Sequence, residues 1–394
     1  MKQSKTEAVP MAHRMADIQP FHVMDLLARA RKMEAAGKSI VHLEIGEPDF
    51  VTPQPIIDAG QLALQNQKTH YTPALGLPEL RQAIAQYYQR RFNIDVPWQR
   101  IVITPGASGA LQLALGVLVN PGQQVLMADP GYPCNRHFVR LFEGSALSVA
   151  VDAGTAYQLT AQHISEHWNE NTIAAMLASP SNPTGTVVEK TEMRAIAQQV
   201  KQRGGRLLVD EIYQGLVYDG EDYTVLEFTD QAFVINSFSK YFGMTGWRLG
   251  WLVVPEGYVD AVDRLAQNIF LAAPTLSQYA ALAAFSDATQ LILQQRRDEF
   301  RVRRDYLLPA LRDLGFKIPL TPQGAFYIYA DCSQFTDDSY QFVDQLLHDA
   351  GVAITPGIDF GEHRAAQHVR FAYTRSVDVL AQAVQRLSKV LQNK

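Results

Sequence analysis

Residues 206–254 read RLLVDEIYQGLVYDGEDYTVLEFTDQAFVINSFSKYFGMTGWRLGWLVV and contain three short apolar runs, at 207–209, 233–235 and 251–254. Each run has the length and apolar character of a buried strand. The first ends on Asp210, and the second runs into a polar segment that ends on Lys240. Ligands bind beyond the carboxyl ends of the strands in open α/β sheets. We therefore expect these two side chains at the ligand-binding edge of such a sheet.

The same alternation of apolar runs and longer segments continues upstream of residue 206. Three further runs have the character of buried strands, at 101–103, 125–127 and 173–177. Most of the six runs are separated by enough residues for a helix. This rhythm predicts an α/β domain with a largely parallel sheet between helices.

The two ends of the chain have different patterns. Residues 21–43 predict an amphipathic helix followed by a strand, and the charged segment 299–314 predicts a second helix. We also expect short strands at 316–319 and 325–329 and a final helix at 377–391. We interpret both ends as parts of one smaller α+β domain, into which the large domain is inserted. The expected division is an N-terminal arm with part of the small domain at 1–55, the large domain at 56–288 and the C-terminal small domain at 289–394.

Composition limits the classes of function. A chain of 394 residues is long for one hydrophobic core, and its hydrophobic fraction of 47% is ordinary for a globular protein. The net charge of −5 gives no reason to expect nucleic acid or an anionic membrane as a partner. No apolar run approaches the ~18 residues that cross a bilayer, and residues 1–20 lack the apolar core of a signal peptide. Cys134 and Cys332 lie far apart in the sequence, so we expect a reducing compartment, the cytoplasm.

Polar groups at four predicted strand ends suit a phosphorylated aldehyde cofactor. The glycine-containing segment 106–109 opens a predicted helix, whose free N–H groups bind anions. Asp210 offers one carboxylate to a ring nitrogen, and Lys240 offers an amine to an aldehyde. Two hydroxyl donors and a guanidinium that could close around a phosphate come from Ser237, Ser239 and Arg248. Together these groups describe a site for pyridoxal 5′-phosphate (PLP).

Residues 237–250, SFSKYFGMTGWRLG, resemble the PLP-lysine signature of class I/II (fold-type I) aminotransferases, and the resemblance covers most of the chain. Six further segments match in the family's order: 45–49 IGEPD, 71–73 YTP with Gly76 and Leu80-Arg81, 129–133 DPGYP, 182–185 NPTG, 210–213 DEIY and 368–371 HVRF. They resemble the subgroup of aspartate, alanine and aromatic aminotransferases. The resemblance implies a fold-type I PLP-dependent transferase, whose large PLP-binding domain has a mostly parallel sheet between helices, plus a smaller α+β domain.

The resemblance also implies a role for each matching residue. Lys240 would form the Schiff base with the cofactor and then act as general base and acid. Asp210 would pair with the ring nitrogen and keep it protonated, while Asn182 and Tyr213 would hydrogen-bond the 3′-oxygen of the ring. Tyr132 would stack on the ring face. The phosphate would be held by Ala107, Ser108, Ser237, Ser239 and Arg248.

Reaction and assembly follow from the same resemblance. The enzyme would move an amino group from an α-amino acid to a 2-oxo acid in a ping-pong cycle between PLP and its amine form. Arg370, with the backbone of Gly46 and the side chain of Asn182, would bind the substrate α-carboxylate. Tyr71 would reach the phosphate of a partner subunit, so a homodimer with shared active sites is expected. No metal is expected in the site.

Ser108 bears on the choice of amino donor. Aspartate-preferring relatives of this subgroup usually place a lysine at this position, where it meets the distal carboxylate of the substrate. Ser108 therefore predicts a neutral or aromatic donor. An arginine from the partner subunit could still restore recognition of an acidic side chain.

Other interpretations are open at this point. A fold-type I lyase or decarboxylase would use the same cofactor residues, because the reaction depends on which Cα bond lies perpendicular to the ring. A PLP-binding regulatory module is not expected, since no DNA-binding extension is present at either end. Residues 163–167, HISEH, match a metal-binding helix pattern but lie away from the predicted edge. The segment 106–109 lacks the spacing of a hydrolase nucleophile elbow, and no GxGxxG follows a strand.

Overall fold

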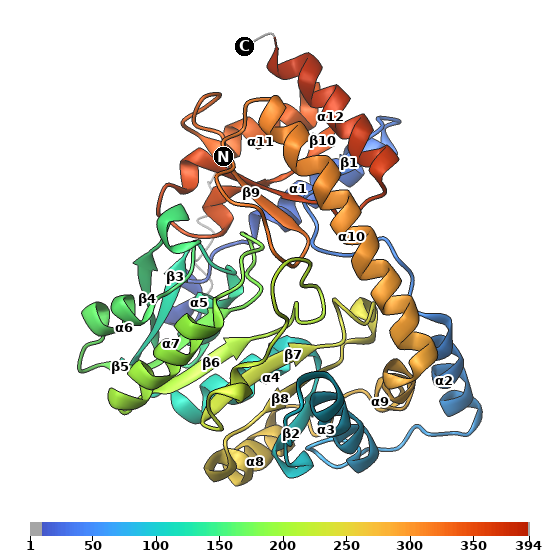
Figure 1. Cartoon of the computed structure of the whole chain (residues 1–394), viewed down its shortest axis with the longest axis vertical. Helices are drawn as coiled ribbons and strands as arrows, with labels where there is room; N and C mark the ends of the chain where they lie inside the picture. The colour runs from blue at the N-terminus through green and yellow to red at the C-terminus, as the bar shows by residue number, and fades with distance from the viewer. Residues whose placement is uncertain (1–9, 393–394) are drawn as a thin grey trace, which may run out of the picture.

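The computed structural model describes residues 10–392. The expectation that residues 1–20 contain no signal peptide therefore falls partly, at residues 1–9, outside the described residues. Figure 1 shows a larger body around a seven-stranded sheet and a smaller body around a three-stranded sheet. Helices cover the large sheet on both sides. The predicted α/β architecture with a mostly parallel sheet is confirmed.

The large sheet has the strand order β2-β8-β7-β6-β5-β3-β4. Its strands β3 to β7 run parallel, whereas β8 pairs antiparallel with both β7 and β2. All six predicted strands are confirmed, as β2 (Ile101–Thr104), β3 (Gln124–Asp129), β5 (Thr172–Ala178), β6 (Arg206–Asp210), β7 (Ala232–Ser237) and β8 (Gly250–Val253).

One strand of the large sheet was not predicted. β4 (Ser145–Ala150) lies at the edge of the sheet and pairs only with β3. Of its six side chains only that of Val149 is buried. A partly exposed edge strand needs no continuous apolar run, so the pattern that reveals the central strands does not reveal this one.

Side chains that alternate along the strands divide the core of the large body in two. In β2, Val102 belongs to one hydrophobic cluster and Ile101 and Ile103 to the other, because successive side chains of a strand point to opposite faces. The first cluster packs the sheet against α4 (Gly106–Leu118), α5 (Cys134–Leu141) and α8 (Val259–Ile269). The second cluster packs it against α3 (Pro78–Phe92), α6 (Ala161–His167) and α7 (Lys190–Gln202).

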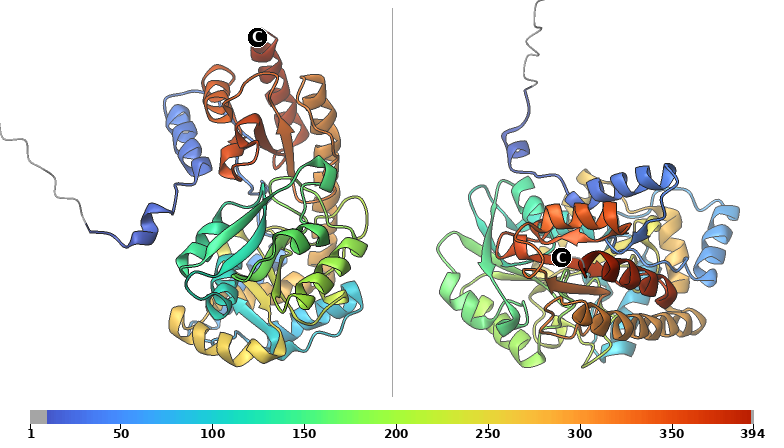
Figure 2. Two further views of the ribbon diagram at one scale, coloured as in Figure 1. Left: turned by 90° about the vertical axis from the view of Figure 1, so that its left-hand side faces the viewer. Right: turned by 90° about the horizontal axis from the view of Figure 1, so that it is seen from above.

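The smaller body brings the two ends of the chain together. β1 (Val41–His42) pairs in parallel with β10 (Val352–Ala353). An antiparallel sheet is formed by β11 (Thr355–Pro356), β12 (His368–Ala372) and β9 (Tyr327–Asp331). The helices around these strands are α1 (His22–Ala35), α11 (Ser339–Asp349) and α12 (Val377–Leu391), of which α12 has the predicted bounds (Figures 1 and 2).

Two predictions near the C-terminal end need correction. The helix expected at 299–314 begins earlier, as α10 (Asp287–Asp313). It runs alongside both bodies, from the region of α2 (Gln54–Gln65) and α9 (Thr275–Leu282) to α12 (Figure 1). Residues 316–319 form no strand; only Lys317 pairs, with Asp331, and Pro319 has no N–H to extend the ladder. The division of the chain at residues 55 and 288 stays a prediction.

Other expected features also have a place in the fold. No helix within residues 10–392 is long and apolar enough to cross a membrane. The HISEH segment lies in α6, where the ring of His163 accepts the Thr160 N–H and the Thr160 hydroxyl accepts the His163 N–H. This reciprocal pair is a helix cap, which explains His163 without a metal.

Candidate active site

A cavity of about 420 Å³ lies where the carboxyl ends of the central strands meet the smaller body. It is lined by residues from β6, β7, the start of α4 and the smaller body. All predicted site residues line it except Tyr71: Gly46, Ala107, Ser108, Tyr132, Asn182, Asp210, Tyr213, Ser237, Ser239, Lys240, Arg248 and Arg370. Tyr71 lies outside the cavity with 83% of its side chain exposed.

One side of the cavity offers donors for an anion. α4 begins at Gly106, no side chain caps this end, and its first turn contains no acidic residue, so its N–H groups and dipole favour an anion. The Ser237 hydroxyl accepts the Ser239 N–H at 3.0 Å, which fixes both serines in the same turn. Arg248 forms no ion pair with any carboxylate in residues 10–392. Gly106 has a φ of +70°, a backbone conformation that favours glycine, and a Cβ there would lie 2.8 Å from Nη2 of Arg248.

Asp210 ends β6 and is buried in the cavity wall. One of its oxygens accepts the Ile212 N–H at 3.0 Å. Burial raises its pKa to about 6, although the Ile212 N–H and the charge of Lys240 oppose that shift. A buried carboxylate with spare hydrogen-bonding capacity suits a cationic ring N–H, which would restore its usual ionisation.

Lys240 follows β7 by three residues, and its amine points across the cavity. Nζ donates to the carbonyl oxygen of Gly46 at 2.6 Å. Burial lowers the pKa of Lys240 to about 8, against the attraction of Glu47. The neutral amine is therefore more populated at physiological pH than in an ordinary lysine. That is the protonation state that an aldehyde requires.

Arg370 in β12 is buried in the cavity wall and could bind a carboxylate. Its Nη1 donates to Oδ1 of Asn182 at 2.9 Å, and its Nη2 donates to the carbonyl of Glu44 and to Thr355. Nε is buried and finds no partner among the described residues. The guanidinium lies between the rings of Tyr327 and Phe360, 4.3 Å and 4.8 Å from their centroids.

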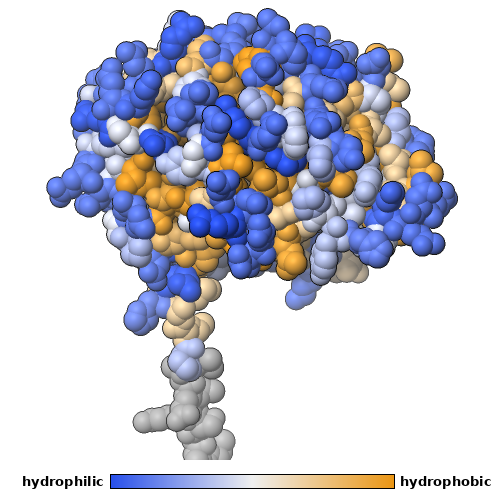
Figure 3. Space-filling model, turned by 90° about the horizontal axis from the view of Figure 1, so that it is seen from below, coloured by the Kyte–Doolittle hydropathy of each residue, from blue (hydrophilic) through white to orange (hydrophobic). Residues whose placement is uncertain are grey.

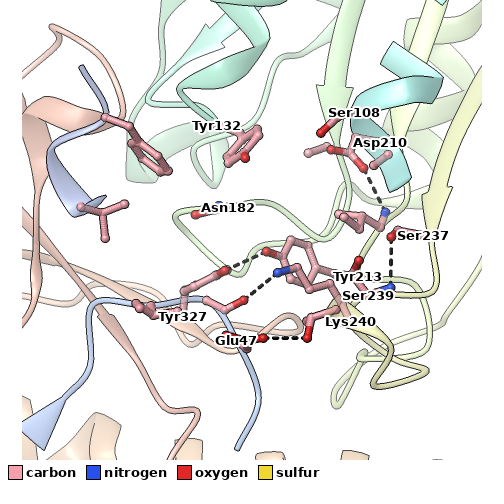
Figure 4. A pocket seen from close by; sticks show the side chains of 18 of the residues that line it. Glu47, Ser108, Tyr132, Asn182, Asp210, Tyr213, Ser237, Ser239, Lys240 and Tyr327 are labelled. Carbon is pink, nitrogen blue, oxygen red and sulfur yellow. Dashed lines mark hydrogen bonds between the residues drawn. The ribbon is translucent and has the colours of Figure 1, made fainter. Parts of the chain in front are cut away.

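Aromatic and amide side chains lie between these two regions. In Figure 4 Ser108, Ser237 and Ser239 lie on one side of the cavity, and Tyr132 and Asn182 face them across it. The hydroxyl of Tyr213 lies 2.8 Å from that of Tyr327. Phosphate donors, a carboxylate and an amine thus surround one space, and this donor set fits PLP.

Several lining residues were not among the predicted site residues. Glu47 accepts a hydrogen bond from Thr245 at 2.6 Å, and it lies in the IGEPD segment that carried the resemblance. Tyr327 lies in a predicted strand, but nothing in the sequence links it to Tyr213. A Cβ on Gly46 would lie only 1.8 Å from the Tyr327 hydroxyl, so the tyrosine occupies the space that Gly46 leaves. Apolar side chains at the start of α1 complete the lining, from Phe21, Val23 and Met24.

Comparison with known proteins finds similarity along nearly the whole chain. The family model described as aminotransferase class I and II matches residues 38–387. A valine–pyruvate aminotransferase of Mycobacterium tuberculosis is 40% identical, over 95% of this chain and 97% of the relative. A (5-formylfuran-3-yl)methyl phosphate transaminase of Methanocaldococcus jannaschii is 37% identical, over 97% of this chain and 99% of the relative.

Solved structures agree with these matches. The crystal structure of an aminotransferase from Mycobacterium tuberculosis superposes with a TM-score of 0.95 at 39% identity, covering 98% of this chain and 100% of the other. An aspartate aminotransferase from Thermus thermophilus, solved with maleate, superposes with a TM-score of 0.92 at 31% identity, over 97% and 100% of the two chains. These relatives do not favour the lyase or decarboxylase alternative. The chain therefore belongs to the class I and II aminotransferases, and it is a PLP-dependent enzyme that moves an amino group from an α-amino acid to a 2-oxo acid.

Proposed function

We propose that the cavity around Lys240 is the active site and that its preferred amino donor is a neutral α-amino acid. The observation that carries the first part is the meeting of three buried groups in one cavity: the amine of Lys240, the carboxylate of Asp210 and the guanidinium of Arg370. Each of the three has a task in transamination.

Each of these groups has one step to perform. Bound PLP supplies an aldehyde for the amino group and a ring that accepts electrons from Cα. Lys240 would hold the cofactor, and its amine, once free, would remove the proton from Cα of the donor. Asp210 would hold the proton on the ring nitrogen, which would keep the ring an electron acceptor. Arg370 and Asn182 bind the donor's carboxylate and so fix the direction of the Cα–H bond.

The phosphate of the cofactor would lie against the start of α4. Its proposed ligands are the N–H groups and side chains of Ala107, Ser108, Ser237, Ser239 and Arg248. We further propose that Tyr71 of the partner subunit completes this set, which makes the enzyme a homodimer with shared active sites. The exposure of Tyr71 supports this proposal. Figure 3 shows apolar side chains between polar borders on the lower face of the molecule, and exposed apolar surface of this kind is typical of interfaces between subunits.

A neutral donor is supported by the charges around the cavity. Its cationic lining residues are Lys240, Arg248 and Arg370, and each already has a task in the proposed mechanism. Ser108 stands where acidic-substrate relatives place a lysine. Apolar side chains also line the cavity, among them Phe21, Val23 and Met24. The valine–pyruvate relative, at 40% identity, also has a neutral donor in its name, whereas the aspartate enzymes match at about 31–33%.

The test is a comparison of donors in the amino-transfer half-reaction. Alanine, valine, leucine, phenylalanine and aspartate are compared by kcat/KM, from the change in cofactor absorbance. A lost charge-assisted hydrogen bond to the distal carboxylate is worth ~1.5–3 kcal/mol, so aspartate should be about ten- to a hundredfold poorer. Ser108→Lys should narrow that gap if the phosphate is still bound. A first rank for aspartate in the wild type would show that another cation recognises its side chain.

Two further proposals concern the compartment of the protein and its division into domains. We propose the cytoplasm, supported by the wide separation of Cys134 and Cys332 in the sequence and by their free state in the fold. We also propose that 56–288 forms the cofactor-binding domain and that 1–55 and 289–394 form the smaller domain. The pairing of β1 with β10 supports the joining of the two ends.

A further inference from the structure

The start of α1 borders the cavity, but its own N-cap side chain cannot accept its first N–H groups. Phe21 stands at the N-cap position, where Ser, Thr, Asp or Asn would normally accept the first N–H groups. Phe21, Val23 and Met24 line the cavity with apolar side chains. We name these three residues the α1 roof. Its backbone needs an acceptor from elsewhere in the chain.

Asp359 supplies that acceptor from more than 300 residues away. Its Oδ1 accepts the His22 N–H at 2.9 Å, and its Oδ2 accepts the Val23 N–H at 2.9 Å. The carboxylate is buried, with 2% exposure, so water does not compete for these bonds. Both oxygens are used on the first turn of α1.

The loop that carries Asp359 is itself fixed to both sides of the active site. The next residue, Phe360, stacks on the guanidinium of Arg370, and its carbonyl accepts the Gly131 N–H at 2.8 Å beside Tyr132. Gly361 lies so close to Asp129 that a Cβ would be 1.7 Å from its carboxylate oxygen. These contacts hold the loop of Asp359 against Arg370 on one side and against the segment of Tyr132 on the other.

We propose that Asp359 is a positioning residue for donor recognition: it holds the α1 roof at a set height above the donor side chain, and so determines which neutral side chains fit. This proposal rests on the proposed function, because it assumes that an apolar donor side chain lies under Phe21, Val23 and Met24. Asp359 touches neither donor nor cofactor. It acts through α1, and its two hydrogen bonds link donor side-chain recognition to the loop that also supports Arg370.

The experiment measures KM and kcat separately for donors of increasing size: alanine, valine, leucine and phenylalanine. In Asp359→Ala the roof loses its attachment and the apolar contacts that it makes with a large side chain. Contacts of this kind in a hydrophobic pocket discriminate by about tenfold or more. KM for leucine and phenylalanine should therefore rise about tenfold or more, and KM for alanine, which hardly reaches the roof, should change much less. The absorbance of the bound cofactor should stay as in the wild type.

Asp338 provides a matched control. Asp338 also caps a helix with its carboxylate: it is the N-cap residue of α11, where Oδ1 accepts the N–H groups of Tyr340 at 3.0 Å and Gln341 at 3.1 Å, and it does not line the cavity. Asp338→Ala should lower the melting temperature and leave KM for every donor unchanged. Asp359→Asn, which keeps one acceptor oxygen, should give a smaller effect of the same size dependence. Phe21→Ala shortens the roof directly, and it should reproduce the loss for large donors even if Asp359→Ala does not fold.

The outcomes separate this proposal from the proposed function. If aspartate is the best donor of the wild type, the proposed neutral specificity is wrong. If neutral donors are preferred but KM rises equally for alanine and phenylalanine in Asp359→Ala, Asp359 has only a structural role and the inference is overturned. Unchanged KM values for all donors in both Asp359→Asn and Phe21→Ala would also overturn it.

Discussion

Replacing Arg370 by lysine tests the proposed carboxylate binding most sharply, because lysine keeps the positive charge and removes the planar fork. The guanidinium donates to Asn182 and to the Glu44 carbonyl, and Nε has no partner within residues 10–392. The rings of Tyr327 and Phe360 contact the same guanidinium. A single ammonium cannot keep both neighbours and also bind a carboxylate through two atoms.

The expected loss can be worked out from these contacts. The ammonium of lysine can keep at most one of the two charge-assisted hydrogen bonds to the donor's carboxylate, so at least one bond worth ~1.5–3 kcal/mol is lost. At ~1.4 kcal/mol for each factor of ten, kcat/KM for alanine should fall by about ten- to a hundredfold or more. Ethylamine, which has no carboxylate, is a poor donor for the wild type, and its rate should hardly change. The ratio of the two rates is therefore the diagnostic quantity.

The assay is the half-reaction of Arg370→Lys with alanine and with ethylamine, at matched cofactor loading. Arg81→Lys is a suitable control, because Arg81 is also buried and hydrogen-bonded, to the carbonyls of Ile101 and Gln99, but does not line the cavity. The control should leave the alanine-to-ethylamine ratio unchanged. An equal fall for both donors in Arg370→Lys would show that Arg370 supports the fold and does not bind the carboxylate.

Three further predictions concern the cofactor side of the cavity. Asp210→Ala removes a buried charge partner worth ~3–5 kcal/mol, so removal of the Cα proton should slow by about 10²- to 10⁴-fold, and a near-normal half-reaction of the loaded variant would contradict this. In the enzyme freed of cofactor, the Lys240 pKa of about 8 predicts that its labelling by an aldehyde reagent rises with pH up to about 8 and then levels off. Labelling of ordinary lysines continues to rise until the pH approaches their pKa of ~10.4, and a labelling profile of that shape at Lys240 would contradict the lowered pKa. Mixing Lys240→Ala chains with Tyr71→Phe chains should give heterodimers with about half the activity of the wild-type dimer, because one of their two sites carries both changes and the other carries neither. No rescue in proven heterodimers would place Tyr71 in its own subunit's site.

The central strands could be predicted because both of their faces are covered. A continuous apolar run such as Phe233–Ile235 is the direct result of burial on two sides, and it marks the strand and the polar residues that follow it. β4 escaped prediction for the opposite reason, since only Val149 of its side chains is buried. The segment 316–319 has the composition of a strand, but a single pairing through Lys317 is all that it forms.

Some residues of the candidate site could be predicted from the sequence, and others could not. Lys240, Asp210 and Arg370 lie in local segments that resemble the family, so their numbers could be given from the sequence. Tyr327 and Asp359 could not, because their contacts join segments 114 and more than 300 residues apart. The Tyr213–Tyr327 contact depends on how the smaller body sits on the larger one, and the contact of Asp359 with α1 depends on how the two ends of the chain join in the smaller body. No local sequence pattern carries that information.

The measurement that tests the central claim most directly is identification of the lysine that holds the cofactor. The loaded enzyme is treated with borohydride, which makes the link to lysine permanent, and is then digested and mapped by mass spectrometry. The pyridoxyl group should be found on Lys240, the cavity amine that donates to the Gly46 carbonyl. The same treatment of Lys240→Ala should leave no pyridoxyl group on any lysine. A stoichiometric pyridoxyl group on any other lysine of the wild-type enzyme would contradict the assignment of this cavity as the active site.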